Sequence, residues 1–115
     1  MSEFNEQVLV FRWVEYNSRK YPQLKYLYSN LNGVRLPIGL AVKCKASGLK
    51  KGVPDLTLDY NNGNYTGLHI ELKIKGGRVS PEQKDFLAFL EKQGRKAVVC
   101  YGHKETIKVI EEYLN

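Results

Sequence analysis

Three charged residues near the middle of the chain have the types and the spacing of a metal-dependent active site. Asp55 begins one run of alternating polar and apolar residues, and Glu71 and Lys73 lie two residues apart in the next run. Side chains alternate between the faces of a strand, so Glu71 and Lys73 share one face and Leu72 points to the other. Two carboxylates on one face could share a hard cation such as Mg²⁺, and the ammonium group could assist a water molecule or stabilise a phosphate transition state. A Glu-x-Lys pair alone also occurs on exposed, salt-bridged strands, so the surrounding sequence decides between the two interpretations.

The elements around these residues are predicted to form an α/β fold, a small mixed sheet flanked by helices. Alternation and apolar runs favour strands over residues 55–60, 68–75 and 97–101, and helices over 3–17, 37–47, 80–93 and 106–114. The segment 26–31 could be either a short strand or a helical turn. The first helix has dense apolar positions, namely Val8, Leu9, Val10, Phe11, Trp13 and Val14, and we expect it to be largely buried.

The third of these helices has a clear start signal. Ser80 can cap it, Pro81 suits the first position, and Gln83 completes a capping box. Its buried stripe is expected to consist of Phe86, Leu87, Phe89 and Leu90. This helix would follow the second hairpin strand and Gly94 would end it.

The register of the hairpin decides whether Asp55 and Glu71 can meet. They share a face only if paired residue numbers sum to an even value, because a slip by one residue turns side chains to the opposite face. A two-residue Asn62-Gly63 turn would break this rule. We therefore predict a three-residue loop over 61–63, with Asp55 opposite His69, although a longer loop of odd length or a bulge would also satisfy the rule.

The composition describes one globular domain, residues 1–115, with a basic charge. Lys and Arg number 18 against 12 Asp and Glu, which gives a net charge of +6 and suits a polyanionic partner, although a merely solvated basic surface is the alternative. No apolar run is long enough for a membrane span, and the polar N-terminus is unlike a signal peptide, so we expect an intracellular protein with no membrane partner. Cys44 and Cys100 match no zinc spacing and are expected to be small buried side chains.

Several motifs, in order along residues 2–114, resemble those of one nuclease family. Gly52-Val53-Pro54-Asp55 followed by Glu71-Leu72-Lys73 resembles the PD-(D/E)xK nuclease motif. The capped helix from Ser80, and Asn32-Gly33-Val34-Arg35 ahead of a basic helix, extend the resemblance to the virus-type replication-repair nuclease (VRR-NUC) family. Leu31 departs from it, because proline is expected there. The resemblance implies a restriction-endonuclease-like core of the αβββαβ type.

The same resemblance implies roles for individual residues. Asp55 and Glu71 match the acids that bind Mg²⁺ or Mn²⁺, and the backbone carbonyl of Leu72 is a further ligand. Lys73 matches the catalytic lysine, and Gln83 matches the glutamine on the helix behind the active site.

The first helix of such nucleases often adds a glutamate to the metal site. Glu3, four residues before Gln7, fits the usual spacing, and Glu6 is the alternative because it lies on nearly the same helix face. Candidates for contacts with DNA phosphates are the basic residues that cluster in the middle of the chain: Arg35, Lys43, Lys45, Lys50, Lys51, Lys75 and Arg78.

The function expected from these residues is hydrolysis of phosphodiester bonds in branched or structured DNA by a metal-dependent endonuclease. The resemblance further implies a homodimer similar to Holliday-junction resolvases, in the cytoplasm of a bacterial or phage-infected cell, without an organic cofactor. The apolar residues Val10, Phe11, Trp13 and Val14 are a candidate dimer interface. A non-catalytic nucleic-acid-binding module and a sequence-specific restriction-type endonuclease are the alternatives. His69 is expected to be a solvent-facing strand residue or a polar neighbour of the site, and His103 a capping or surface residue.

Overall fold

The order of helices and strands follows the expected one closely. The computed structural model describes residues 2–30 and 36–115. Its elements are α1 (Glu3–Asn17), η1 (Pro22–Tyr26), β1 (Leu27–Ser29), α2 (Ile38–Ala46), β2 (Leu56–Leu58), β3 (Leu68–Lys73), α3 (Pro81–Lys92), β4 (Lys96–Tyr101) and α4 (Gly102–Leu114). The ambiguous segment 26–31 contains the end of the short helix η1 and the strand β1. No described helix has both the length and the apolar character needed to cross a membrane.

The sheet is mixed, as predicted. Its strand order is β1-β2-β3-β4, with antiparallel pairing among the first three strands and parallel pairing between β3 and β4. A parallel neighbour needs a crossover connection, and α3 supplies it between β3 and β4. The expected fold class, α/β with a small mixed sheet flanked by helices, is therefore confirmed.

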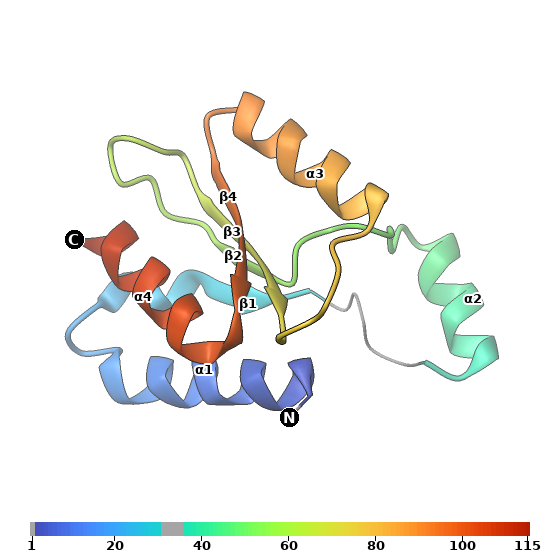
Figure 1. Ribbon diagram of the computed structural model, residues 1–115, viewed down its shortest axis with the longest axis horizontal. Coiled ribbons are helices and arrows are strands. Elements are labelled where there is room, and N and C mark those ends of the chain that lie inside the picture. Colours follow the sequence, from blue (N-terminus) through green and yellow to red (C-terminus); the bar gives the residue numbers. More distant parts are fainter. Residues whose placement is uncertain (1, 31–35) are drawn as a thin grey trace.

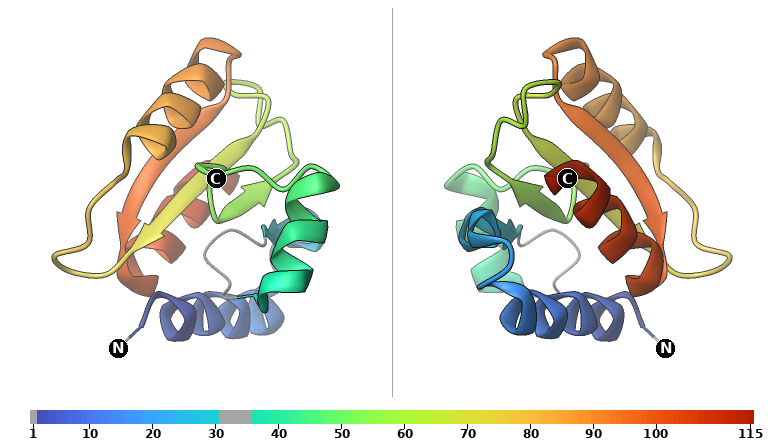
Figure 2. Two further views of the ribbon diagram at one scale, coloured as in Figure 1. Left: turned by 90° about the vertical axis from the view of Figure 1, so that its right-hand side faces the viewer. Right: turned by 90° about the vertical axis from the view of Figure 1, so that its left-hand side faces the viewer.

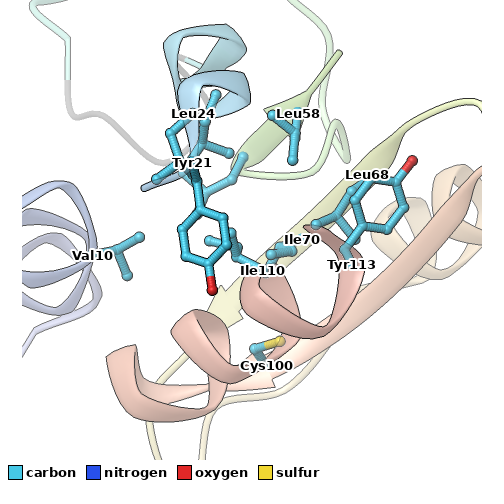
Figure 3. Close-up of a cluster of buried hydrophobic side chains, with 11 residues drawn as sticks. Val10, Tyr21, Leu24, Leu58, Leu68, Ile70, Cys100, Ile110 and Tyr113 are labelled. Atoms are coloured by element: carbon cyan, nitrogen blue, oxygen red, sulfur yellow. The ribbon is translucent and has the colours of Figure 1, made fainter. Parts of the chain in front are cut away.

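The two faces of the sheet differ in what covers them. Leu68 and Ile70 of β3 point to the face that packs against Val10 of α1 and Ile110 of α4, in the larger of two apolar clusters. Figure 1 shows α1 and α4 on this side of the sheet, and Figure 3 shows their side chains meeting those of the strands. The opposite face carries His69, Glu71 and Lys73, and α3 packs on it through a smaller cluster with β4.

The first helix is less buried than its composition predicts. Val10 is its one buried residue, and Phe11, Trp13 and Val14 lie partly buried against the same cluster. The prediction that the helix is largely buried is wrong, because it packs on the rest of the domain along one side only. Val10 is buried within the chain and so is not part of an exposed dimer interface, whereas Phe11, Trp13 and Val14 keep some exposed surface and stay a predicted interface.

The helix α3 begins as the sequence predicts. Ser80 Oγ accepts a hydrogen bond from the Gln83 backbone amide at 3.2 Å, and Gln83 Oε1 accepts one from the Ser80 amide at 2.8 Å. This capping box satisfies two amide groups that the first turn leaves without helical partners. Leu87 and Leu90 are buried, whereas Phe89, expected in the buried stripe, lies 58% exposed on the outer side of the helix.

The hairpin satisfies the even register but not the predicted loop. Thr57 pairs with His69 and Leu58 with Leu68, so residues 59–67 connect the strands and the three-residue loop is wrong. The connection turns toward α4, where the Tyr113 hydroxyl lies 2.6 Å from the Tyr60 carbonyl oxygen and 3.1 Å from that of Tyr65. These contacts with a distant helix stabilise a wide loop where the local sequence alone favours a tight one.

The helix α2 lies apart from the sheet. Figures 1 and 2 show it beside the end of the sheet at which β2 begins and β3 ends. None of its residues is buried. Cys44, expected to be buried, is only half-buried there, whereas Cys100 is buried in β4 as predicted.

Candidate active site

The register brings Asp55 and Glu71 to the same place. Continuing the pairing of Thr57 with His69 by two residues sets Asp55 opposite Glu71, rather than opposite His69 as predicted. Asp55 lies just before β2, and its Oδ2 accepts a 2.8 Å hydrogen bond from the backbone amide of Leu72. The strand that carries Glu71 therefore also holds Asp55 in position.

Glu71 is buried among polar groups that satisfy only one of its two oxygens. The residue is 2% exposed. Its Oε2 accepts a 3.1 Å hydrogen bond from Gln83 Nε2 and lies 3.6 Å from Lys73 Nζ. Its Oε1 is buried without a hydrogen-bond partner. A buried carboxylate oxygen with no donor is costly, so this atom indicates the position where a cation would bind.

Burial sets the protonation behaviour of the two carboxyl groups. Burial, and then the charge of Asp55, raises the pKa of Glu71 to about 8, against the partial opposition of Lys73. Burial also raises the pKa of Asp55, although the side-chain contact with Glu71, the Leu72 amide and Lys73 counteract it. Neighbouring carboxyl groups with raised pKa values are a feature of functional sites, because a bound metal ion can compensate their negative charges.

The capping box of α3 fixes which end of the Gln83 amide faces Glu71. Because Gln83 Oε1 is engaged by the Ser80 amide, its Nε2 is left to donate to Glu71. The capping box, which joins residues only three apart in the sequence, thus orients a side chain of the site. This is the residue expected on the helix behind the active site, and the structure places it in direct contact with Glu71.

The turn before Asp55 is held tightly against the same helix. Gly52 has φ +89°, and a Cβ atom there would lie 2.7 Å from the backbone of Glu82. Only glycine fits such an approach with this backbone conformation. The contact fixes the turn that leads into Asp55 relative to the first turn of α3.

The two candidate glutamates of α1 have different neighbours. A Cβ atom at Gly77 would lie 3.5 Å from Glu3 Oε2 and 3.5 Å from Lys73 Cδ, so Glu3 is near the site lysine. Glu6 Oε2 instead lies 2.9 Å from His103 Nδ1. In the described part of the chain, no three His, Cys, Asp or Glu side chains are grouped as metal ligands, so neither glutamate completes a triad with Asp55 and Glu71.

The basic residues expected to contact DNA surround this end of the sheet. The connections that carry them enter β2 and leave β3, and in an antiparallel pair those strand ends are adjacent. All of the described ones are exposed: Lys43, Lys45, Lys50, Lys51, Lys75 and Arg78. Arg35, with the rest of residues 31–35, lies outside the described residues.

A polar chain that the sequence analysis missed runs along the same sheet face. His69 is 6% exposed, so the expectation that it faces solvent is wrong. Its Nε2 lies 3.1 Å from Arg95 Nη1 and its Nδ1 lies 3.3 Å from Thr57 Oγ1. A guanidinium group can only donate, so Nε2 accepts and the ring is neutral with its proton on Nδ1. Burial, together with the charge of Arg95, accordingly lowers the pKa of His69.

This chain continues to the turn that carries Asp55. Asn30 Nδ2 donates to Thr57 Oγ1 at 3.3 Å and to the Pro54 carbonyl oxygen at 2.8 Å. Arg95 was not singled out in the sequence because it lies in the short turn between α3 and β4. Period-two alternation puts His69 on the face of Glu71, and the second expectation for it, a polar neighbour of the site, agrees with its burial and its polar contacts.

Comparison with known proteins agrees with this arrangement. The VRR-NUC domain model matches residues 4–104. A solved structure described as a VRR_NUC domain protein superimposes with a TM-score of 0.79 and 32% identity, over 99% of this chain and 88% of that chain. No curated protein matches the chain. A fold with a paired Asp and Glu beside a buried lysine on one sheet face is of the nuclease type, and the chain belongs to the VRR-NUC family.

Proposed function

We propose that this protein is a Mg²⁺- or Mn²⁺-dependent endonuclease that hydrolyses phosphodiester bonds in branched or structured DNA, similar to a Holliday-junction resolvase. The observation that carries the proposal is the buried pair of carboxylates, in which Glu71 Oε1 has no hydrogen-bond partner and the pKa of Glu71 is raised to about 8. A non-catalytic DNA-binding module would have no use for two buried acids that destabilise each other.

The residues of this chain fit a hard divalent cation. Asp55 and Glu71 provide carboxylate oxygens, and Mg²⁺ prefers few protein ligands and several waters, so a two-acid site suits it. The Leu72 amide points toward Asp55, and the N–H and C=O of one strand residue point to the same side. This supports the Leu72 carbonyl oxygen as a third ligand, and Glu3 as a more distant candidate.

Each residue has a distinct task in the proposed reaction. A bound cation supplies Lewis-acid stabilisation of the phosphate and lowers the pKa of a coordinated water. Lys73, held 3.6 Å from Glu71 Oε2, accepts a proton from the attacking water or stabilises charge on the phosphate. Gln83 holds Glu71 through its amide, and this keeps the carboxylate in one orientation.

The DNA substrate is proposed to lie across the exposed cations at this end of the sheet. Lys50 and Lys51 on one side and Lys75 and Arg78 on the other lie in the two connections that border the site. Phosphate contacts of this kind position DNA without reading its sequence.

The test is cleavage of labelled four-way junctions, flaps and linear duplex in parallel, with Mg²⁺, Mn²⁺ or EDTA. The expected result is metal-dependent cutting of the branched substrates, in paired and symmetric positions on the junction if the protein is the proposed homodimer. Sedimentation of the same preparation checks the dimer independently. Absence of cutting with either metal would refute the proposed activity, and equal cutting of linear duplex would refute the preference for structured DNA.

A further inference from the structure

The helix α2 exposes an unusual amount of apolar surface. Ile38 is 86% exposed, Leu40 48% and Val42 63%. Ala41 and Cys44 are half-buried, and no residue of the helix is buried. Leu40 lies on the side of Cys44, away from Ile38 and Val42. Ile38 and Val42 are four residues apart and therefore share one face of the helix. Adjoining exposed apolar side chains of this kind mark a surface that another molecule covers.

The charges of α2 and of the sequence on either side of it indicate what kind of molecule covers the helix. Between Glu15 and Asp55 the sequence contains no Asp or Glu, although it contains eight Lys and Arg residues: Arg19, Lys20, Lys25, Arg35, Lys43, Lys45, Lys50 and Lys51. Lys43 and Lys45 lie on α2 itself, and Lys50 and Lys51 follow it. None of these four lysines forms an ion pair with a described residue. A surface that combines exposed apolar side chains with lysines of this kind is complementary to a polyanion that also offers apolar surface.

The short connection between α2 and the site favours DNA as the molecule that covers α2. Gly52, directly after Lys50 and Lys51, is packed against the backbone of Glu82 in α3, and Asp55 follows three residues later. A DNA strand held at Asp55 and Glu71 would therefore continue past α2. In a regular duplex the base faces are stacked and closed to aliphatic side chains. At a branch point they are exposed, and Ile, Leu and similar side chains insert between unstacked bases in DNA-bending proteins.

From these observations we propose that α2 is a wedge, in which Ile38 and Val42 contact unstacked bases at a DNA branch point while the neighbouring lysines bind the flanking phosphates. The proposal rests on the proposed nuclease function and adds to it the element that selects branched over linear DNA. It makes the apolar side chains responsible for the preference and the lysines responsible for affinity that branched and linear DNA share.

The test is equilibrium binding in EDTA by the full chain carrying Asp55→Asn, which separates binding from cleavage. The probes are a four-way junction with 2-aminopurine at the branch and a linear duplex with the same arm sequence. The variant is Ile38→Ala with Val42→Ala, since alanine removes the apolar tips and favours the helix. Phe89→Ala is the matched control, because Phe89 is a comparably exposed residue on the outer side of α3.

The wedge predicts that the double variant binds the junction at least about tenfold more weakly, a loss of about 1.4 kcal/mol, and the duplex within about twofold. It also predicts that the rise in 2-aminopurine fluorescence is lost, and that Phe89→Ala changes neither result. Unchanged junction binding, or an equal loss on both DNAs, would overturn the proposal. So would junction binding that survives while the variant loses self-association in sedimentation or adhesion to phosphatidylglycerol vesicles, because α2 would then serve a second copy or a membrane.

The failure of the wedge and the failure of the nuclease proposal give different results. If the unsubstituted chain cuts no DNA but its junction preference depends on Ile38 and Val42, the reaction is wrong and the wedge remains. If the chain cuts junctions and the double variant still prefers them, the wedge is wrong and the nuclease remains.

Discussion

The carboxylate pair and the helix α2 are joined by a short connection over residues 47–54 but are built in opposite ways. Glu71 and Lys73 are 2% and 8% exposed, and hydrogen bonds from Gln83 and the Leu72 amide hold the two acids. On α2 no residue is buried and the lysines have no ion-pair partner among the described residues. Catalytic groups must be held in position before the substrate binds, whereas the side chains of a binding surface can find their interaction partners in the bound molecule. We therefore expect substitutions in the two regions to affect different measurements.

The largest difference is expected in the rate of cleavage. Asp55→Asn, Glu71→Gln and Lys73→Ala should each reduce single-turnover cleavage of saturating junction DNA at least about 100-fold, because each removes a proposed metal ligand or the lysine proposed to accept a proton or stabilise charge. Lys43→Ala with Lys45→Ala should change that saturated rate less than about threefold, because α2 acts in binding. Binding of the three site variants, measured separately, should remain close to that of the unsubstituted chain. A full cleavage rate for Asp55→Asn would contradict the assignment of the site.

The next largest difference is expected in stability. Ile70→Ala removes a fully buried side chain from the centre of β3 and should lower the free energy of unfolding by about 2–5 kcal/mol. Val42→Ala on α2 should change it by no more than about 0.5 kcal/mol, because the side chain is exposed. Urea denaturation followed by circular dichroism checks both. A large loss for Val42→Ala would mean that α2 is packed within the protein rather than available to a partner.

The metal-free protein should lose stability as the pH rises. The pKa of Glu71 is raised from 4.5 to about 8 in the folded state, so the folded chain holds its proton more tightly than the unfolded chain. Stability is therefore greatest below pH 4.5 as far as this group is concerned, and it declines as the pH increases from 4.5 to about 8. Melting temperatures in EDTA over this interval should fall for the unsubstituted chain and fall less for Glu71→Gln.

Two additions sharpen this pH experiment. Mg²⁺ or Mn²⁺ should raise the melting temperature most at the alkaline end, where both acids are ionised and bind a cation best. Gln83→Glu should steepen the decline in EDTA, because it keeps the capping box but sets a carboxylate against Glu71. Identical pH profiles for the unsubstituted chain and Glu71→Gln would show that Glu71 is not the group responsible.

The smallest effect is expected for the lysines at the border between the two regions. Lys50→Ala with Lys51→Ala should weaken binding to junction and duplex about equally and reduce the slope of log affinity against log salt by roughly two units at most. Titrations at several salt concentrations measure this slope. An unchanged slope would remove both lysines from the DNA interface, whereas Lys92→Ala, an exposed lysine at the far end of α3, should leave it unchanged.

The local sequence determined most of the secondary structure and the identity of the acidic pair. The capping box at Ser80 and Gln83 and the alternation around Glu71 depend on neighbours in sequence, and the structure confirms both. The sequence also predicted that paired residue numbers in the hairpin sum to an even value. Strand geometry allows Asp55 and Glu71 to meet only in such a register. These features could be predicted because their causes lie within a few residues of each other.

Tertiary structure alone decided the features that depend on distant partners. Tyr113 of α4 holds the wide loop between β2 and β3, where the local sequence favours a tight turn. Arg95, from the turn before β4, lies against His69 and buries a residue that a strand pattern leaves open to solvent. His103 binds Glu6 and so separates it from Glu3, which helix spacing could not do. Side-chain contacts across the chain select among conformations and neighbours that the local sequence leaves nearly equal in free energy.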